Sequence, residues 1–247
     1  MGTVIVTGAS RGIGAAIARL AGLRGYAVAV NFNSGEAEAK KVAAEIVDAG
    51  GRALAIHADV SREDQIVTLF QTAERELGPT KALVNNAGIT GGFARVENVT
   101  AEAIEKTFAV NVTGAMLCAR EAVRRMSTKR DGSGGAIVNI SSIAARTGAA
   151  GEWVHYAASK GAIDSFTIGL AREVATEGIR VNAVKPGLID TEIHAASGEP
   201  GRLQRLMGTI PMNRPGQPNE IAEAVLWLLS PAASYVTAAI LEIGGGR

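Results

Sequence analysis

The chain has 247 residues, with 25 basic and 24 acidic side chains and a formal net charge of +1. This length suits one large α/β domain, and the balanced charge argues against a nucleic-acid face or a polybasic membrane patch. The single cysteine, Cys118, excludes an intramolecular disulfide and, with only three histidines, argues against a zinc site. We therefore expect small molecules or copies of the chain as partners, with no nucleic acid, no membrane and no metal.

The first residues carry no sign of a secretory signal. Residues 2–7 already have a buried-strand pattern, without a charged region followed by a longer apolar core. No apolar run reaches the ~18 residues of a membrane span. The sequence therefore predicts a cytoplasmic protein.

The chain opens with a strand, a glycine-rich turn and a helix. Val4 to Val6 form a short apolar run, and residues 12–23 have helical periodicity. Between them lies Gly8-Ala9-Ser10-Arg11-Gly12-Ile13-Gly14, whose glycines would let the backbone approach a pyrophosphate at a helix N-terminus. The spacing differs from the Gly-x-Gly-x-x-Gly of the general dinucleotide fingerprint. The glycines and the following helix N-terminus indicate a nucleotide-binding loop, although a tight turn without a ligand could have the same composition.

The second strand, residues 27–32, predicts which nicotinamide cofactor is bound. A carboxylate that binds the ribose 2′-hydroxyl of NAD is expected near its end, where Asn31, Phe32, Asn33 and Ser34 stand instead. Without an acidic residue to repel a 2′-phosphate, and with Arg11 able to pair with one, the pattern favours NADP(H), while NAD(H) remains possible. Arg11 could also be a solvated loop cation.

Polar residues follow the next strands directly. Asp59-Val60 follows the strand at 53–57, and Asn85-Asn86-Ala87-Gly88 follows the strand at 82–84. In an open parallel sheet ligands lie outside the carboxyl ends of the strands, so Asp59 could face the adenine and the asparagines could stiffen the sheet. A pair of turn residues is the competing interpretation. A further strand at 136–140 delivers Ser141 and Ser142 to the same edge.

The remaining elements complete the alternation of strands and helices. A helix at 101–125 should be interrupted near Asn111 to Gly114, and strands are expected at 179–184 and 239–243. Residues 190–218 are rich in Gly, Pro and polar residues and predict a mobile substrate lid with a short helix at 202–207. With no linker and no repeat, residues 1–247 predict one α/β domain: a Rossmann-type, doubly wound parallel sheet of about seven strands.

Tyr156 and Lys160 form the pattern on which the chemistry depends. If residues 156–176 are helical, the two side chains are four apart and share a face. A nearby cation would favour the phenolate of Tyr156, and Ser142 could hydrogen-bond the same oxygen. Tyr-x-x-x-Lys alone is equally compatible with a solvated aromatic and a surface lysine. The helix also carries small and apolar residues on more than one stripe, which predicts two buried faces, one of them against another subunit.

The combination of these motifs resembles the short-chain dehydrogenase/reductase family over essentially the whole chain. The similarity rests on residues 7–14, Asn85 to Gly88, Asn111, Ser142, Tyr156-x-x-x-Lys160 and Pro186-Gly187, all in family order. Within the family it resembles the NADP-preferring type, such as 3-oxoacyl-carrier-protein reductases and glucose 1-dehydrogenase-like members. The resemblance implies hydride transfer between nicotinamide C4 and a carbonyl or secondary alcohol, and a homotetramer.

The resemblance also implies the role of each site residue. Tyr156 is the expected general acid/base, Ser142 polarises the reacting oxygen, Lys160 lowers the Tyr156 pKa and holds the nicotinamide ribose, and Asn111 supports Lys160 through a water. The expected cofactor contacts are Gly8, Ser10, Arg11, Gly12, Ile13, Gly14, Asn31, Asn33, Ser34, Asp59, Val60, Asn86, Ala87, Gly88, Tyr156, Lys160, Pro186, Gly187, Ile189 and Thr191.

Two departures from the family pattern and two competing functions stay open. Ser142 lies fourteen residues before Tyr156 where thirteen is commonest, so Ser141 is a fallback assignment, and the tail lacks the acidic residue often found just before the terminal Gly-Gly. A non-catalytic NADP-sensing regulator is the main alternative function, but such sensors typically lose the Tyr or Lys. A sugar-nucleotide epimerase or dehydratase would normally need a longer chain. We expect the substrate pocket to be formed by residues 91–95, Ile143, Trp153, His155, Gly187 and the lid.

Overall fold

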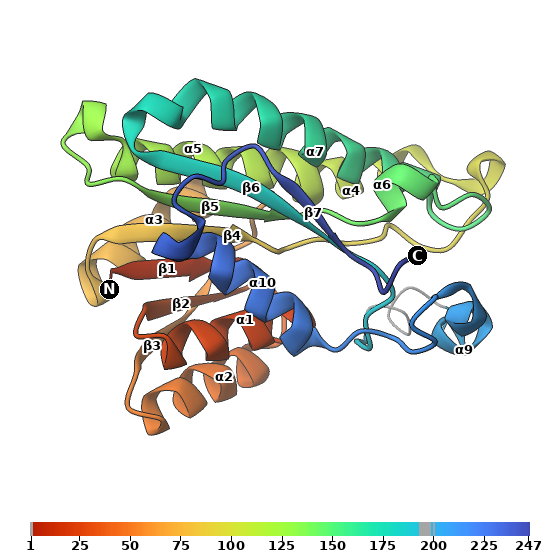
Figure 1. Ribbon diagram of the computed structural model, residues 1–247, viewed down its shortest axis with the longest axis horizontal. Coiled ribbons are helices and arrows are strands. Elements are labelled where there is room, and N and C mark those ends of the chain that lie inside the picture. The colour runs from red at the N-terminus through yellow and green to blue at the C-terminus, as the bar shows by residue number, and fades with distance from the viewer. Residues whose placement is uncertain (1, 193–198, 200) are drawn as a thin grey trace.

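The computed structural model describes residues 2–192, 199 and 201–247, which fold around one parallel sheet (Figure 1). The strand order is β3-β2-β1-β4-β5-β6-β7, and all neighbouring pairs are parallel. The strands are β1 (Thr3–Val6), β2 (Ala27–Phe32), β3 (Arg52–His57), β4 (Thr80–Asn85), β5 (Gly135–Ile140), β6 (Ile179–Pro186) and β7 (Ile240–Ile243). The expected doubly wound sheet is thus confirmed.

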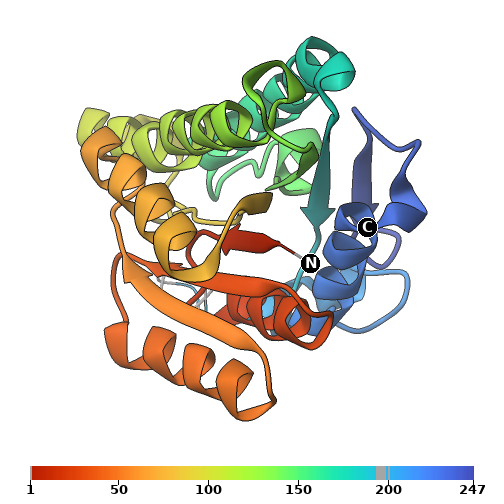
Figure 2. The ribbon, with the colours of Figure 1, turned by 90° about the vertical axis from the view of Figure 1, so that its left-hand side faces the viewer.

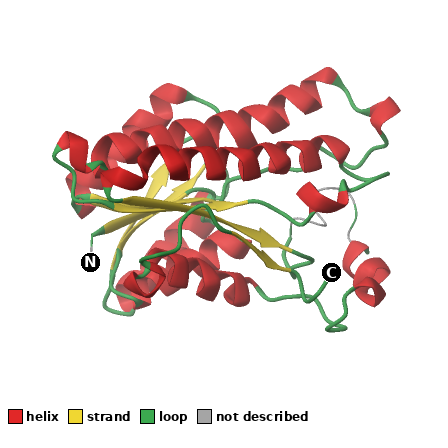
Figure 3. Cartoon of the chain, turned by 45° about the horizontal axis from the view of Figure 1, so that its top comes forward, coloured by secondary structure: helices red, strands yellow, loops and turns green. Residues whose placement is uncertain are grey.

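Helices cover both faces of the sheet. The helices are α1 (Gly12–Leu23), α2 (Glu36–Asp48), α3 (Glu63–Leu77), α4 (Ala101–Phe108), α5 (Ala115–Met126), α6 (Ala144–Thr147), α7 (Val154–Val174), α9 (Arg202–Leu206) and α10 (Pro218–Leu229). Single 3₁₀ turns are η1 (Val96–Asn98), η3 (Thr128–Arg130), η4 (Ala175–Glu177), η5 (Met207–Thr209) and η6 (Pro231–Ala233), and η2 (Ala109–Gly114) is a π-helix. Figure 2 shows the two helical layers on either side of the strands, and Figure 3 shows the sheet between them.

Alternating side chains of the strands supply two apolar cores. Val4 and Val6 face α1, α2 and α10, whereas Ile5 between them faces α3, α5 and α7. Successive side chains of a strand point to opposite faces, so an unbroken apolar run such as residues 4–6 requires burial on both sides. All three residues are fully buried. The carboxyl ends of the strands converge at one edge, beside α9 (Figure 1).

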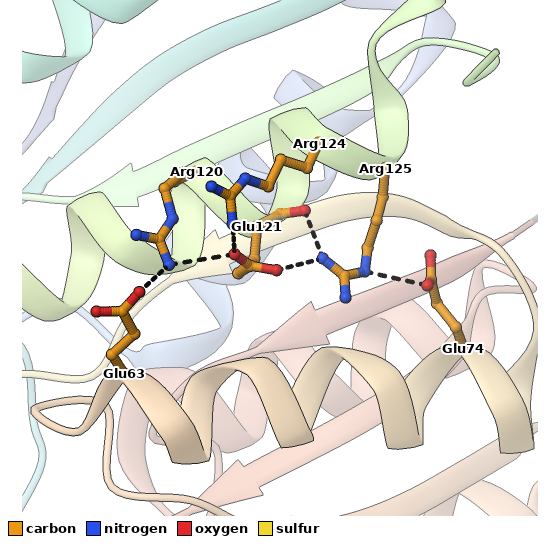
Figure 4. Close-up of polar contacts among 6 residues, drawn as sticks. All are labelled: Glu63, Glu74, Arg120, Glu121, Arg124 and Arg125. Carbon is orange, nitrogen blue, oxygen red and sulfur yellow. Dashed lines mark hydrogen bonds and ion pairs between the residues drawn. The ribbon is translucent and has the colours of Figure 1, made fainter. Parts of the chain in front are cut away.

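A buried carboxylate joins α5 to its neighbours (Figure 4). Glu121 is 3% exposed, and its oxygens accept hydrogen bonds from Arg120, Arg124 and Arg125 at 2.6–3.2 Å. Arg125 also pairs with Glu74 of α3 at 3.0 Å. Burial by itself raises the pKa of Glu121, but Arg125 and Arg124 outweigh it and lower the pKa below its ordinary value. This cluster anchors α3 against α5 on the side of the sheet that carries the α7 helix.

The expected lid overlaps the described residues only in part. Residues 193–198 and 200 lie outside them. The described part contains α9 and η5, which together agree with the short helix expected at 202–207. An isolated bridge between Ile189 and Gly216 brings the two ends of the segment together. None of the helices in the described part of the chain combines the length and the apolar character that crossing a bilayer requires.

Candidate active site

A cavity of about 620 Å³ opens at the carboxyl edge of the sheet. It is lined by the ends of β2, β4, β5 and β6, by the glycine-rich turn after β1, and by Thr191, Glu192 and Arg202 of the segment expected to form a lid. All cofactor contacts expected from the sequence line this one cavity, from Gly8 and Arg11 at one end to Tyr156 and Lys160 at the other. Ligands of doubly wound sheets bind at this edge, so the fold itself places the site.

The glycine-rich turn forms a concave backbone surface, and two of its glycines, Gly8 and Gly14, have no room for a side chain. Gly8 has a φ of +62°, and a Cβ on it would lie 2.9 Å from the Cα of Ala87. A Cβ on Gly14 would overlap the carbonyl oxygen of Gly8 and the amide of Asn86. The turn leads into α1, which begins at Gly12 and has no side-chain cap on its backbone N–H groups. Unpaired N–H groups at the start of a helix suit a phosphate, so this surface fits the pyrophosphate of a dinucleotide.

Two asparagine side chains hold this turn in place. Asn86 donates from its amide to the carbonyl oxygens of Thr7 (2.8 Å) and Gly8 (2.9 Å). Asn31 accepts a hydrogen bond from the backbone N–H of Gly8 at 3.2 Å and donates to the carbonyl oxygen of Ala58 at 3.0 Å. Both side chains therefore use their polar atoms on the backbone around the turn. Asn85, the other member of the expected asparagine pair, instead donates to the carbonyl oxygen of Ala115 at 3.0 Å and to the side chain of Asn139 at 2.9 Å.

The outer end of the cavity presents hydroxyl, amide and guanidinium groups. Ser10, Arg11, Asn33 and Ser34 line it together. The Arg11 side chain is 58% exposed and has a long contact of 3.9 Å with the exposed Glu192. Asp59 accepts hydrogen bonds from the backbone N–H and hydroxyl of Ser61, so its carboxylate is fixed by its own loop. Among the described residues, the acidic side chain paired with Arg11 thus follows β6 and does not come from β2.

Tyr156 lies at the catalytic end of the cavity beside Ser142. Tyr156 is in the first turn of α7, and Ser142 follows β5. Burial raises the pKa of the Tyr156 phenol above its ordinary value, while a hydrogen bond with Ser142 and the charge of Arg202 lower it in part. Desolvation outweighs these two polar partners, so the net direction of the shift is upward. Ser142 accepts a hydrogen bond from the backbone N–H of Ala144 at 3.1 Å.

Ser141 is turned away from this cluster. Its hydroxyl donates to the Asp164 carboxylate at 2.7 Å and is buried under α7. Asp164 is in turn paired with Lys185 of β6 at 2.8 Å. Both serines line the cavity, but of the two only Ser142 acts on the pKa of the Tyr156 phenol. The geometry therefore favours Ser142 over the fallback assignment.

Lys160 is buried behind the tyrosine. Its ammonium donates to the carbonyl oxygen of Ile140, the last residue of β5, at 2.8 Å, and lies 5.6 Å from the centre of the Tyr156 ring. Burial lowers the pKa of Lys160 to about 8, and Asp164 opposes this. A Cβ on Gly88 would lie 3.4 Å from the ammonium. The ammonium is thus confined between β5, Gly88 and the tyrosine ring.

Asn111 stands in the π-helix η2, where the sequence predicts an interruption. Its amide donates to the carbonyl oxygen of Ile89 (2.9 Å) and to the hydroxyl of Ser159 (3.0 Å), and its oxygen accepts from the N–H of Ile89 (2.8 Å). A Cβ on Gly88 would meet both the Asn111 oxygen and the Lys160 ammonium, which places these two groups around the same glycine. Asn111 is not part of the cavity wall itself.

The predicted substrate walls are correct in part. Ile143, Trp153 and Gly187 line the cavity, as do Gly91 and Gly92. His155 does not: it is 6% exposed and packs against Gly91, with both ring nitrogens lacking a hydrogen-bond partner. Arg202 lines the cavity from within the expected lid segment, and Glu152 and Arg247, which were not among the expected walls, line it as well. No local motif identifies them, because they meet only in the folded chain.

The described residues contain no group of three or more histidine, cysteine or acidic side chains able to hold a metal ion. The groups present suit a nicotinamide dinucleotide: a backbone cradle at a helix N-terminus, polar groups for a ribose, and a phenol beside a serine and a lysine. The fold and the site define an oxidoreductase of the nicotinamide-dependent class.

Comparisons with known proteins identify the family. A family model described as enoyl-(acyl carrier protein) reductase matches residues 8–247. The chain is 53% identical to the uncharacterized oxidoreductase YgfF of Escherichia coli K12, and the alignment covers 100% of both chains. It is 39% identical to glucose 1-dehydrogenase 2 of Bacillus subtilis, with 99% of this chain and 93% of that protein covered. A crystal structure of a dehydrogenase/reductase from Sinorhizobium meliloti matches with a TM-score of 0.92 and 37% identity, covering 99% of this chain and 94% of that one.

The chain therefore belongs to the short-chain dehydrogenase/reductase family and is an NAD(P)-dependent oxidoreductase that acts on a small molecule. The expected resemblance, including that to glucose 1-dehydrogenase-like members, is confirmed at this level.

Proposed function

We propose that this protein is an NADP(H)-dependent reductase or alcohol dehydrogenase that interconverts a carbonyl group and a secondary alcohol, with Tyr156 as the general acid/base. The observation that carries the proposal is that Ser142, Tyr156 and Lys160 line the same cavity as the glycine-rich turn. The cofactor, when bound, supplies or accepts a hydride at nicotinamide C4. The substrate is a secondary alcohol, ketone, sugar or 3-oxoacyl thioester.

Each catalytic residue has a role that its position supports. Tyr156 exchanges a proton with the reacting oxygen, and Ser142, hydrogen-bonded to the phenol, polarises and orients that oxygen. Lys160 holds the nicotinamide ribose and favours the phenolate of Tyr156 once the cofactor is in place. Asn111, through its contacts with Ile89 and Ser159, positions the segment around Gly88 and, through a water, supports Lys160.

The preference for NADP(H) rests on the outer end of the cavity. Arg11 is exposed there beside Ser10, Asn33 and Ser34, and β2 ends without an acidic side chain. A guanidinium and two hydroxyl groups match the charge and the acceptors of a 2′-phosphate. NAD(H) would lose these contacts but would meet no repulsion from β2.

We also propose that the protein is cytoplasmic and assembles as a homotetramer through α5, η2 and α7. Small residues of α7, namely Ala158, Ser165 and Gly169, are exposed on the face opposite to the sheet, and nothing lies within 4 Å of a Cβ built on Gly169. A helix of this kind can pack closely against a symmetry mate. Light scattering that shows a monomer at micromolar concentration would contradict the assembly.

Replacement of Tyr156 by Phe tests the proposed activity. We expect Tyr156→Phe to bind NADPH as the wild type does and to lose at least about a hundredfold in turnover of a carbonyl panel, since proton transfer by a positioned side chain contributes about 10²–10⁴-fold. If the protein is a non-catalytic sensor, the wild type should bind the cofactor but turn over no compound of the panel. The wild type and Tyr156→Phe should then bind the sensor's partner equally well. Unchanged turnover in Tyr156→Phe would exclude the proposed acid/base.

A further inference from the structure

Glu152 connects three segments that are distant in the sequence. It lies in the loop between α6 and α7, its carboxylate is in contact with α9, and its backbone carbonyl oxygen accepts a hydrogen bond from the N–H of Ala94 at 3.0 Å. The catalytic helix, the lid helix and the loop after β4 thus meet at one residue. All three segments contribute to the cavity that holds Tyr156.

Both oxygens of the Glu152 carboxylate are bound by guanidinium groups of α9. Arg202 donates from Nε and Nη2 to Oε2 at 3.0 and 2.8 Å, and Arg205 donates from Nη2 to Oε1 at 2.7 Å. The side chains of Glu152 and Arg202 are only 13% and 9% exposed. Burial alone would raise the pKa of Glu152, but the hydrogen bonds and charges of the two arginines lower it, so the carboxylate is ionised at neutral pH. Removing one member of such a buried pair leaves the other charge poorly compensated.

The same arginine covers the residue that follows Glu152. The Arg202 guanidinium lies 4.2 Å from the centre of the Trp153 ring, and Trp153 contacts Tyr156 edge-on with ring centres 6.1 Å apart. Trp153 is 4% exposed and also meets Phe93 edge-on at 6.3 Å. A continuous set of contacts therefore runs from α9 through Arg202 and Trp153 to the catalytic tyrosine. Cation–π contacts of this kind strengthen when the partners are desolvated.

An electrostatic effect accompanies these contacts. Arg202 is the charged group that lowers the pKa of Tyr156 in this structure. The other charged side chains that line the cavity are Arg11, Asp59, Lys106, Glu152, Lys160, Glu192 and Arg247. Because Glu152 holds Arg202 in position, it also determines how near this charge lies to the phenol.

We propose that Glu152 is a positioning residue that fastens α9 over the substrate side of the cavity, and that Arg202, held by it, fixes Trp153 against Tyr156 and so shapes the binding site of the carbonyl substrate. The proposal rests on the proposed reductase function and refines it, because it assigns to the Glu152–Arg202 pair an effect on substrate binding and none on cofactor binding. Other ion pairs of the chain lie away from the cavity, for example the exposed Arg19–Glu45 pair at 2.6 Å.

The kinetic test compares Glu152→Gln with Glu45→Gln, in which an exposed pair far from the cavity loses the same charge. We expect Glu152→Gln to raise KM for the carbonyl substrate by about tenfold or more with little change in the NADPH dissociation constant, since it loosens positioning without touching the cofactor. Glu45→Gln should behave as the wild type. An unchanged KM in Glu152→Gln would overturn the proposal, as would an equal loss of NADPH affinity.

The role of Arg202 is tested by comparing two of its variants. Arg202→Gln removes the positive charge and should therefore move the alkaline limb of the kcat/KM profile to higher pH, because the pKa of Tyr156 rises. Arg202→Lys keeps the charge but not the planar group on Trp153, so it should leave the limb near its wild-type pH while raising KM. Identical pH profiles for both variants and the wild type would show that Arg202 does not act on Tyr156.

A measurement without turnover separates failure of this proposal from failure of the proposed function. The chain has two tryptophans, Trp153 and Trp227, so Trp227→Phe leaves Trp153 as the single indole reporter. In that background acrylamide quenching should be weak and should rise by about twofold or more when Glu152→Gln is added, because release of α9 exposes the ring. Unchanged quenching overturns the proposal even if no substrate is known. Increased quenching in a protein that turns over no carbonyl compound would support it while contradicting the reductase function.

Discussion

The Lys160 ammonium lies 5.6 Å from the centre of the Tyr156 ring, one turn further along α7, and is hydrogen-bonded to the carbonyl oxygen of Ile140 at 2.8 Å. The lysine is therefore held by the end of β5 rather than by the phenol. Its neighbourhood is desolvated, which lowers its pKa to about 8, while the same burial raises the pKa of Tyr156. Burial in the same environment therefore shifts both pKa values, that of Tyr156 upward and that of Lys160 downward.

The low pKa of Lys160 predicts a specific pH dependence of stability. In the unfolded chain this lysine titrates near 10.5, so between pH 8 and 10.5 the unfolded state binds more protons than the folded state. The free energy of unfolding of the wild type, relative to Lys160→Met, should therefore rise by about 1–3 kcal/mol across this window. Denaturant unfolding of the wild type and of Lys160→Met at pH 7.5 and 10 measures this difference in the free energy of unfolding. A pH-independent difference would mean that burial does not depress the Lys160 pKa.

Arg11→Ala should reduce the affinity for NADPH and leave that for NADH unchanged. A charge-assisted hydrogen bond to a phosphate contributes about 1.5–3 kcal/mol, so we expect a loss of about 10- to 100-fold for NADPH. Arg24→Ala is the matched control, because Arg24 follows the last turn of the same helix and pairs with Glu223 at 3.1 Å. Fluorescence titrations with both cofactors give the ratio of the NADPH and NADH dissociation constants. If Arg11→Ala keeps the wild-type ratio, the preference arises elsewhere in the cavity.

Asn86→Ala should weaken both cofactors equally. The variant loses the hydrogen bonds to the carbonyl oxygens of Thr7 and Gly8 and leaves these groups unpaired beneath the glycine-rich turn. We expect a stability loss of about 1–3 kcal/mol and a parallel drop in NADPH and NADH binding. Asn98→Ala, at an exposed position, should change neither quantity. A selective effect on one cofactor would show that Asn86 acts on the 2′-phosphate, the only group that differs between the two, and would contradict its role beneath the shared turn.

The Glu121 cluster predicts an acid-sensitive contribution to stability (Figure 4). The folded pKa of Glu121 is lowered below its ordinary value of 4.5, so the stabilisation is present above this value and is lost as the pH falls through the folded pKa. At pH 7 Glu121→Gln should be less stable than the wild type by about 1–3 kcal/mol, since it loses hydrogen bonds to charged partners. The gap should narrow below pH 4.5. Glu105→Gln, which changes an exposed side chain of α4, should show neither effect.

Local patterns predict most of the sheet and the cofactor half of the cavity. Apolar runs such as residues 4–6 can be recognised in the sequence because a parallel strand is buried on both faces. The turn at Gly8 to Gly14 can be recognised because a phosphate-binding loop needs glycines, which carry no side chain. The break at Asn111 is also predicted, and the structure shows it to be a π-helix. Helix α3 is absent from the sequence-based expectations, although Ile66, Phe70 and Ala73 lie on its buried face at helical spacing.

The substrate half of the cavity could not be predicted in the same way. Glu152 and Arg202 are 50 residues apart, and their pairing depends on how α9 returns to the catalytic helix. His155 is adjacent to Tyr156 in sequence, but one step along a helix turns a side chain by about 100°, which places it outside the cavity. The Tyr156 pKa likewise follows from burial, which the spacing of Tyr156 and Lys160 does not reveal.

The most direct test is a fluorescence titration of the purified wild-type protein with NADPH and with NADH under identical conditions. The proposed function predicts binding of both, with NADPH tighter by about tenfold or more, which corresponds to about 1.4 kcal/mol. Equal or tighter binding of NADH would contradict the assignment of Arg11 to a 2′-phosphate. Binding of neither would contradict the proposed NADP(H)-dependent reductase itself.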